Sequence, residues 1–292
     1  MNRSSEPNVI IPPTSQLYMM LNRLLDNQRI VIFTGLPGVG KSLLINQLAH
    51  LAYFSGHKVH LFQWDVLRNA FMTDRIASLF PDTDGITHSV IRRAAGLWVR
   101  QVVAKWHQEH LGEKSILIGE APLIGNRLLE LVLPRNDAAE SILLEESTRF
   151  VLPIPSRRIR RMMETARQAS IKNPRDSREL SDAAPEVLKA LWMELLHAAR
   201  ALNIPTPPES SNEEYDPKTY ESVYLQVLKH RRYEITRIDI RLSAHDRSVY
   251  TFDMPIKELI PNVSEVSHSI EEVEHSYPNL NELEQEMGEW YA

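Results

Sequence analysis

The sequence predicts an α/β fold in which a mainly parallel central sheet is flanked by helices in three layers. Short β-branched apolar runs alternate with segments whose apolar residues recur at helical spacing, the order that gives parallel strands joined by right-handed crossovers. The octapeptide Gly35-Leu36-Pro37-Gly38-Val39-Gly40-Lys41-Ser42 lies between the first such strand and helix and completes the pattern G-x-x-x-x-G-K-[ST]. Three of the ten glycines fall within it, so it is the most distinctive segment of the 292 residues.

The octapeptide predicts a site for nucleotide phosphates. Glycine permits backbone shapes and close approaches that a Cβ would block, and successive N–H groups then point at phosphate oxygens near the positive end of the next helix. Lys41 can reach the β- and γ-phosphates, and the Ser42 hydroxyl can bind Mg²⁺. The guanine-reading pattern Asn-Lys-x-Asp does not occur, so the expected cofactors are ATP and Mg²⁺. The residues expected to hold the nucleotide are Gly35, Leu36, Pro37, Gly38, Val39, Gly40, Lys41, Ser42 and Leu43.

Composition places the chain among ordinary globular proteins. Its hydrophobic content is 43% and its charged content 24%, and its length suits one elaborated domain or a domain with a subdomain. The chain has no cysteine, which excludes disulfides and thiolate metal sites. The first residues lack the pattern of a signal peptide, and no stretch reaches about 18 uncharged apolar residues. We therefore expect a cytoplasmic protein without a membrane partner.

Charge is distributed unevenly along the chain. The net charge is −5, but residues 263–292 contain eight Glu and no Lys or Arg, which leaves about +3 for residues 1–262. Residues 157–178 carry a net charge of +6. The acidic end is a possible surface for a protein partner, as is the unassigned region 177–216.

The first half of the chain predicts a loose arm over residues 1–13 and then a short helix capped by Thr14 or Ser15. Strands are expected over residues 29–34, 57–62 and 115–119, of which the last is a continuous apolar run typical of a central parallel strand. The expected helices cover residues 43–52, 66–71, 86–110 and 123–133.

The second half predicts a strand over residues 148–152 and helices over 156–170 and 185–202, followed by a Pro-rich connector over 205–217. Later segments are β-prone, at 220–228, 233–242 and 248–254, and two short helices end the chain. We expect a main domain over residues 14–262 with a lid-like region at about 156–217, and an acidic helical tail over residues 263–292.

Glu120 is the best candidate for a second Mg²⁺ ligand. It ends the apolar run 116–119, and such acids commonly follow a strand beside the phosphate loop. The small Gly119 would let a metal–phosphate cluster approach the backbone. A water-mediated contact or a role as a base is also open, as is a helix-capping or salt-bridged Glu. Asp239 is a weaker rival for the metal.

Asp65 follows the second strand and is the candidate general base. A carboxylate there could face the γ-phosphate and accept a proton from an acceptor hydroxyl. Arg68 could hold an anionic acceptor, since guanidinium pairs with phosphate or carboxylate through two hydrogen bonds. Arg127 is placed with these two as a substrate-binding residue. The alternative is an Asp that caps a helix and a solvated Arg one turn later.

The basic helix after the fourth strand supplies candidates for stabilising a transferred phosphoryl group. Contact with a nucleic-acid backbone is less favoured because aromatic residues are not interleaved with the arginines, and a solvated helix face is the third possibility. The full set of expected catalytic residues is Lys41, Asp65, Glu120, Arg157, Arg158, Arg160, Arg161 and Arg167, and the expected metal ligands are Ser42 and Glu120.

With these motifs the chain resembles the P-loop kinase group of the phosphate-loop NTPases, most of all the nucleoside-monophosphate-kinase-like and zeta-toxin-like kinases. Residues 35–42 match the phosphate loop fully, Asp65 and Arg68 are similar to an acceptor-binding pair, and the arginines after residue 155 are similar to a lid. The resemblance covers about residues 29–170. It implies a three-layer P-loop NTPase fold with a helical lid-like insertion, here followed by an acidic C-terminal tail. Glu120 stands where the family usually has Asp.

The predicted function is a Mg²⁺-ATP-dependent phosphotransferase that acts on an unidentified hydroxyl or phosphate acceptor. The alternatives are an ATPase or nucleotide-gated interaction protein without phosphoryl transfer, and a silent nucleotide-binding scaffold. A further hypothesis is that the acidic tail folds over the lid arginines and competes with phosphate. Its alternative is that Leu280, Leu283, Met287 and Trp290 simply pack on the body.

Overall fold

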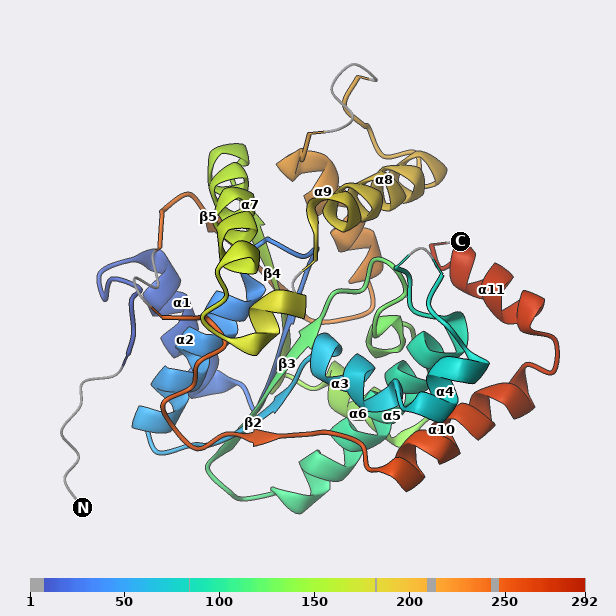
Figure 1. The fold of residues 1–292 in the computed structure, drawn as a ribbon. Helices are drawn as coiled ribbons and strands as arrows, with labels where there is room; N and C mark the ends of the chain where they lie inside the picture. Colours follow the sequence, from blue (N-terminus) through green and yellow to red (C-terminus); the bar gives the residue numbers. More distant parts are fainter. Residues whose placement is uncertain (1–7, 84, 182, 209–213, 243–246, 292) are drawn as a thin grey trace.

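The computed structural model describes residues 8–83, 85–181, 183–208, 214–242 and 247–291 of the chain. Its centre is a six-stranded sheet in the order β5-β4-β1-β3-β2-β6, in which every neighbouring pair of strands is parallel. Figure 1 shows this sheet with helices on either side. The strands are β1 (Ile30–Thr34), β2 (Lys58–Phe62), β3 (Ser115–Ala121), β4 (Thr148–Pro155), β5 (Tyr233–Ile238) and β6 (Lys257–Glu258). The predicted α/β class with a parallel central sheet is confirmed.

Helices cover both faces of this sheet and so form three layers. The α-helices are α1 (Gln16–Asn27), α2 (Lys41–Phe54), α3 (Trp64–Phe71), α4 (Asp74–Leu79), α5 (Ser89–Glu109), α6 (Ala138–Leu144), α7 (Arg157–Lys172), α8 (Pro185–Ala201), α9 (Pro217–Val227), α10 (Val263–Ser276) and α11 (Leu280–Gly288). Val31 and Phe33 share a core with α1 and α2, whereas Ile30 and Ile32 share one with α5, α6 and α9. Alternate residues of a strand point to opposite faces, and helices cover both faces here, which is why every residue of β1 is buried.

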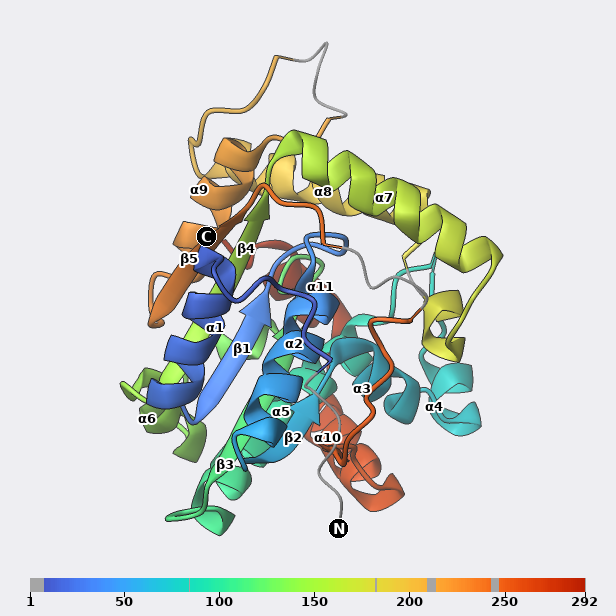
Figure 2. The ribbon, with the colours of Figure 1, turned by 90° about the vertical axis from the view of Figure 1, so that its left-hand side faces the viewer.

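The direction of the chain reverses beside β1. From β1 the chain passes over β3 to β2 through α2, then returns through α5 to β3 and through α6 to β4. Right-handed crossovers in opposite directions must lie on opposite faces of the sheet. The connections that leave β1 and β3 therefore diverge, and ligands of open α/β sheets bind in the crevice outside such strand ends. The loop over residues 35–40 leaves β1 at this point, and α7 and α8 lie beyond the same strand ends (Figure 2).

Three expectations about elements are wrong. Residues 220–228 belong to α9 and not to a strand, because Asp216 caps the helix and Pro217 starts it. Residues 123–133 form a loop with one short 3₁₀ turn, η1 (Leu129–Leu131), and not an α-helix. Residues 248–254 contain no strand. The strands expected over 29–34, 57–62, 115–119, 148–152 and 233–242 are confirmed within a few residues at their ends.

The two ends of the described chain pack on the body. Of the predicted loose arm, residues 1–7 lie outside the described residues, but Ile11 is buried in the core beside α1 and α2. The acidic end forms α10 and α11, which lie against α5. Leu283 and Met287 are buried there, while Leu280 and Trp290 pack on the same core. Within the described part of the chain, every helix is too short or too polar to cross a membrane.

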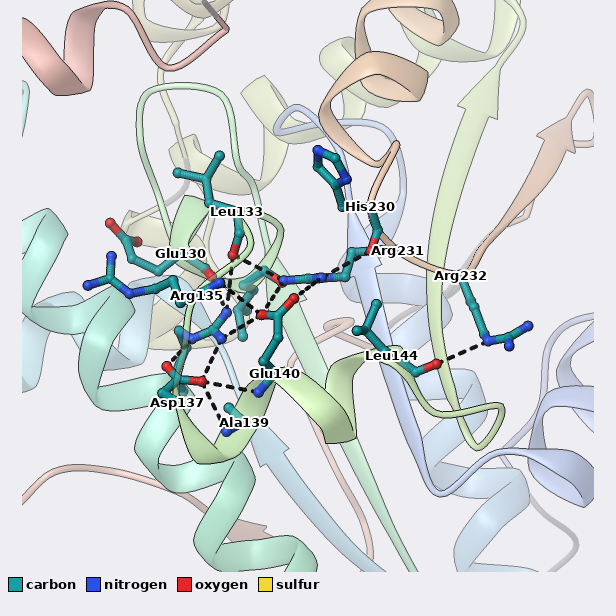
Figure 3. A network of polar contacts seen from close by, with 12 residues as sticks. Glu130, Leu133, Arg135, Asp137, Ala139, Glu140, Leu144, His230, Arg231 and Arg232 are labelled. Carbon is teal, nitrogen blue, oxygen red and sulfur yellow. Dashed lines mark hydrogen bonds and ion pairs between the residues drawn. The ribbon is translucent and has the colours of Figure 1, made fainter.

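A buried ion-pair network joins α5, α6 and the residue that precedes β5 by two positions (Figure 3). Arg231 donates to both carboxylate oxygens of Glu140, at 2.8 and 3.0 Å. Arg100 donates to Glu140 Oε2 at 2.8 Å and to both oxygens of Asp137 at 2.6 and 2.7 Å. Both arginines also donate to carbonyl oxygens of Glu130, Leu131 and Leu133, so the network fixes the end of the loop that follows β3 as well.

Candidate functional site

The phosphate loop adopts the backbone that its glycines were expected to permit. Gly35, Gly38 and Gly40 all have positive φ, of 133°, 79° and 96°. A Cβ at Gly35 would also lie 2.3 Å from the Tyr220 hydroxyl oxygen, so both conformation and space require glycine there. Gly40 is the N-cap residue of α2, which directs the positive end of that helix at the loop.

Lys41 is held inside the loop by the first turn of α2. Its Nζ donates to the carbonyl oxygens of Gly35 at 2.8 Å and Leu36 at 3.0 Å, and it lies 3.3 Å from Glu120 Oε1. The side chain is only 4% exposed. Burial lowers the pKa of Lys41 to about 8, against the opposing effect of the Glu120 charge.

Glu120 reaches Lys41 because its strand β3 pairs with β1, and the loop that leaves β1 leads directly into α2, where Lys41 is the first residue. In the parallel register Glu120 lies beside Phe33, one residue before the end of β1. The role expected of Gly119 differs from its observed one: a Cβ there would lie 2.2 Å from Cζ of Phe62 on β2. The glycine therefore admits an aromatic ring of the core, which occupies the space proposed for a metal–phosphate cluster.

A cavity of about 1280 Å³ opens in front of this loop. One wall is formed by the phosphate loop and by α7, and the segments 240–242 and 247–250 add to it. The opposite wall is formed by α3, the loop after β3, α8 and the end of α11. Cavities that bind small molecules measure roughly 300–1,000 Å³. This cavity is therefore large enough for a nucleotide and a second small molecule.

Asp65 lies in the first turn of α3 and lines the cavity together with Lys41 and Glu120. Arg68 lines it as well, but its guanidinium group is already engaged. Its Nε donates to Thr87 Oγ1 at 2.7 Å, and its Nη2 forms an ion pair with Asp82. The expected pair Asp65 and Arg68 is thus brought to one wall, with Arg68 tied to the loop that precedes α5.

The arginines of α7 are placed differently from one another. Only Arg167 lines the cavity. The buried Arg160 donates to the Pro37 carbonyl oxygen at 2.6 Å and so supports the phosphate loop from behind. The other three candidates are exposed and form ion pairs outside the cavity: Arg157 with Asp216, Arg158 with Asp239, and Arg161 with Glu214. The face of α7 toward the cavity is apolar and carries Ile159, Met162, Met163 and Ala166.

Two weaker expectations find no support in the geometry. Asp239, the rival metal ligand, has a side chain that is 75% exposed and binds Ser156 and Arg158. The acidic tail does not cover the arginines of α7, because α10 and α11 pack against α5 on the other side of the cavity. Glu286 of α11 pairs with Arg93 of α5 at 2.6 Å.

The loop after β3 brings Arg127 to the cavity, beside two residues of α5 and α8 that sequence reasoning did not single out. Arg127, which was expected to bind substrate, lines the cavity together with Arg92 of α5 and Glu194 of α8. Burial lowers the pKa of Arg127, while the charge of Asp65 is the largest effect in the other direction. The dipeptide Gly125-Asn126 is a turn signal that could have identified this loop. No local pattern points to Arg92 or Glu194, because distant helices bring them here.

The oxygen atoms beside the loop suit Mg²⁺. Ser42 offers a hydroxyl and Glu120 a carboxylate, and both line the cavity. Among the described residues, no group of three or more acidic or histidine side chains could by itself hold a metal. Mg²⁺ is commonly bound through one or two such oxygens together with substrate phosphates and water. The donor set therefore fits a magnesium ion that arrives with a nucleotide.

The structure thus gathers Lys41, Ser42, Asp65, Glu120 and Arg127 around one cavity. Comparison with known proteins finds no matching family model, curated protein or solved structure. What this cavity does must therefore be argued from the chemistry of its walls.

Proposed function

We propose that the protein is a Mg²⁺-ATP-dependent phosphotransferase with a P-loop kinase-like site. The observation that supports this most strongly is that Lys41, Glu120 and Asp65 line the same cavity, although they come from α2, β3 and α3. A phosphate-binding loop alone would serve a nucleotide switch equally well. A carboxylate on the opposite wall adds the group that group transfer requires.

Each of these residues has a definite role in the proposal. Lys41 and the N–H groups of the phosphate loop bind the β- and γ-phosphates, and Ser42 and Glu120 hold Mg²⁺, which neutralises charge on those phosphates. Asp65 accepts the proton of the acceptor hydroxyl while the oxygen of that hydroxyl forms a bond to the γ-phosphorus. The bond from that phosphorus to the bridging oxygen breaks, and ADP leaves with the electron pair. Arg167 stabilises the charge on the transferred group.

The test is Asp65→Asn. We expect its ATP affinity to stay within about twofold of the original, because the substitution keeps the shape of the side chain. Transfer of labelled γ-phosphate to a panel of small hydroxyl and phosphate compounds should fall at least about 100-fold, the usual contribution of a general base. Asp74→Asn is the matched control, since Asp74 is an exposed acid in the first turn of α4.

The outcomes separate the functions. Retained transfer by Asp65→Asn would remove Asp65 from the role of base. ATP turnover that no compound of the panel changes, and that survives Asp65→Asn, would favour the ATPase. If neither the original protein nor the control binds Mg²⁺-ATP, the proposal is refuted.

A further inference from the structure

The loop over residues 122–128 has an unusual backbone. Leu123, Asn126 and Leu128 have φ values of 66°, 52° and 62°, and Gly125 has 80°. In the described residues only one other non-glycine position, Asn203, has a positive φ. Leucine rarely adopts this conformation, which costs about 1–3 kcal/mol per residue unless the surroundings hold it in place.

Four helices hold this loop in place. Arg92 of α5 donates to the Gly125 carbonyl oxygen at 2.9 Å, and the Gly125 N–H donates to Glu194 of α8 at 2.9 Å. Asn126 Nδ2 donates to the Met287 carbonyl oxygen of α11 at 2.6 Å. Tyr224 of α9 donates to the Pro122 carbonyl oxygen at 2.6 Å. The loop is therefore fixed from all sides except the one that faces the cavity.

Two guanidinium groups at this wall have unused hydrogen-bond donors. Arg127 donates from Nε to the Ile124 carbonyl oxygen at 3.1 Å, but its buried Nη2 has no hydrogen-bond partner among the described residues. The buried Nε of Arg92 also has none there. Both side chains line the cavity. A donor of a charged group that is buried without a partner is costly, and a water molecule or an anion at the cavity wall would relieve that cost.

We propose that Arg92 and Arg127 form an anion subsite that binds a phosphate or carboxylate group of the second substrate. The inference rests on the proposed function in one respect, because it gives that acceptor a negatively charged group. Guanidinium forks suit both kinds of group through paired hydrogen bonds. The helix α11 closes this side of the cavity, so the acidic end of the chain helps to build the subsite.

The acidic neighbours do not remove the need for an anion. Glu194 accepts from the Gly125 N–H and Glu284 accepts from Ser89, so both carboxylates have other partners. Burial lowers the pKa of Arg92 and of Arg127 despite the opposing charges of these acids and Asp65. Burial still disfavours the charged form of both groups, and a bound anion would stabilise it.

The experiment is a calorimetric titration with inorganic phosphate and, separately, with succinate. The titration uses protein saturated with Mg²⁺-ADP and, in parallel, the Lys41→Gln variant. In the first sample the loop over residues 35–42 is occupied, and in the second it lacks its lysine, so the added anion is kept from binding there. We expect at least one anion to bind in both forms, and the tighter of the two identifies the group that the subsite takes. Arg127→Gln and Arg92→Gln should each raise its Kd at least about tenfold.

Arg23→Gln is the control, because Arg23 is an exposed arginine on α1 paired with Glu234 far from the cavity. The Arg23→Gln variant should bind the anion with the same Kd as the original protein. Arg127→Lys keeps the positive charge but loses the paired donors of the guanidinium group. Its Kd for the anion should lie between those of the original protein and Arg127→Gln. If Arg127→Gln does not fold, the Kd values of Arg92→Gln and Arg127→Lys show whether anion binding depends on the two arginines. Equal Kd values across the arginine variants, or no binding of either anion, would overturn the subsite.

The same samples separate this inference from the proposed function. Arg127-dependent anion binding in a protein that fails to bind Mg²⁺-ADP would leave the subsite standing and the phosphotransferase refuted. Binding of Mg²⁺-ADP without any Arg127-dependent anion would refute the subsite alone.

Discussion

The buried ammonium group of Lys41 would make the proposed binding of a nucleotide depend on pH. Its pKa is lowered to about 8, so the free protein loses this charge as pH rises through 8. Phosphate favours the charged form, and above pH 8 binding must therefore be accompanied by uptake of one proton. We expect the Kd for Mg²⁺-ATP to be constant between about pH 7 and 8 and to rise up to about tenfold per pH unit above 8.

Calorimetry in two buffers of different ionisation enthalpy checks this directly. At pH 9 the two observed binding heats should differ by about the difference between the ionisation enthalpies of the buffers, because about one proton is taken up. At pH 7 the two heats should agree. Equal heats in both buffers at pH 9 would mean that Lys41 stays charged in the free protein.

Gly119 provides a second test at the scale of single residues. Gly119→Ala forces a methyl group against the ring of Phe62, and overpacking of this kind costs about 1–3 kcal/mol. Phe62→Leu should relieve most of that cost, so urea unfolding of the four proteins should give a favourable coupling free energy. Additive losses would contradict the packing explanation. Lost ATP affinity in a stable double variant would instead support close approach of a metal–phosphate cluster.

How much of the site could be predicted depends on how local its determinants are. The backbone of residues 35–42 was predictable because its glycines and the helix that follows them are consecutive in sequence. The ion pair between Arg68 and Asp82 was not predictable, because the loop between α4 and α5 folds back and brings Asp82 next to Arg68. The orientation of α7 could have been predicted, since Ile159, Met162, Met163 and Ala166 follow helical spacing and define the inward face. That spacing turns Arg157, Arg158 and Arg161 outward.

At the scale of elements, the network around Glu140 ties α6 to α5 and to the start of β5. Glu140→Ala would leave the buried guanidinium groups of Arg100 and Arg231, which are 1% and 0% exposed, without their shared carboxylate. Arg100 keeps its two hydrogen bonds to Asp137, but Arg231 loses the carboxylate with which it is paired, and breaking a buried pair in this way costs roughly 3–5 kcal/mol. We expect the midpoint of chemical unfolding to fall accordingly, with ATP affinity unchanged in the protein that remains folded.

Glu146→Ala is the matched control for this change. Glu146 is 90% exposed and lies 3.8 Å from Arg232, and such surface pairs contribute about 0–1 kcal/mol. A loss of stability in Glu140→Ala no larger than in the control would show that water reaches the two arginines.

Element types were predictable where apolar periodicity and end signals agreed, as in β1, α5 and α8. They were not where two signals conflicted. In residues 220–228 the Tyr and Val content favoured a strand, but Asp216 and Pro217 at the start of α9 favoured a helix, and the capped helix formed. The loop over 123–133 has helix-forming leucines, yet contacts with four helices fix it in left-handed conformations. Tertiary contacts outweighed local preference there.

At the scale of the whole molecule, the acidic end belongs to the core. Val266, Ile270, Val273, Leu283 and Met287 are all buried against the body. Burying each such side chain contributes about 2 kcal/mol, and the loss of five approaches the roughly 5–15 kcal/mol that stabilises an entire domain. Deleting residues 263–292 should therefore unfold or aggregate the protein. Thermal unfolding and binding of a hydrophobic dye measure this.

The control for that deletion is a chain in which the exposed acids Glu271, Glu274 and Glu289 are changed to Gln. Removal of charge alone should leave the melting temperature nearly unchanged. A deleted protein that melts like the original would show that the two helices are dispensable and would revive a purely electrostatic role for them.

The pairing of β6 with β2 has a consequence for synthesis of the chain. His60 and Leu61 pair with Lys257 and Glu258, which a ribosome adds about 200 residues later. At roughly 5–20 residues per second, the outer edge of β2 waits about 10–40 s for its partner. During that interval its free N–H and C=O groups can recruit strands from other nascent chains. The protein should therefore depend on chaperones most while its last forty residues are still unmade.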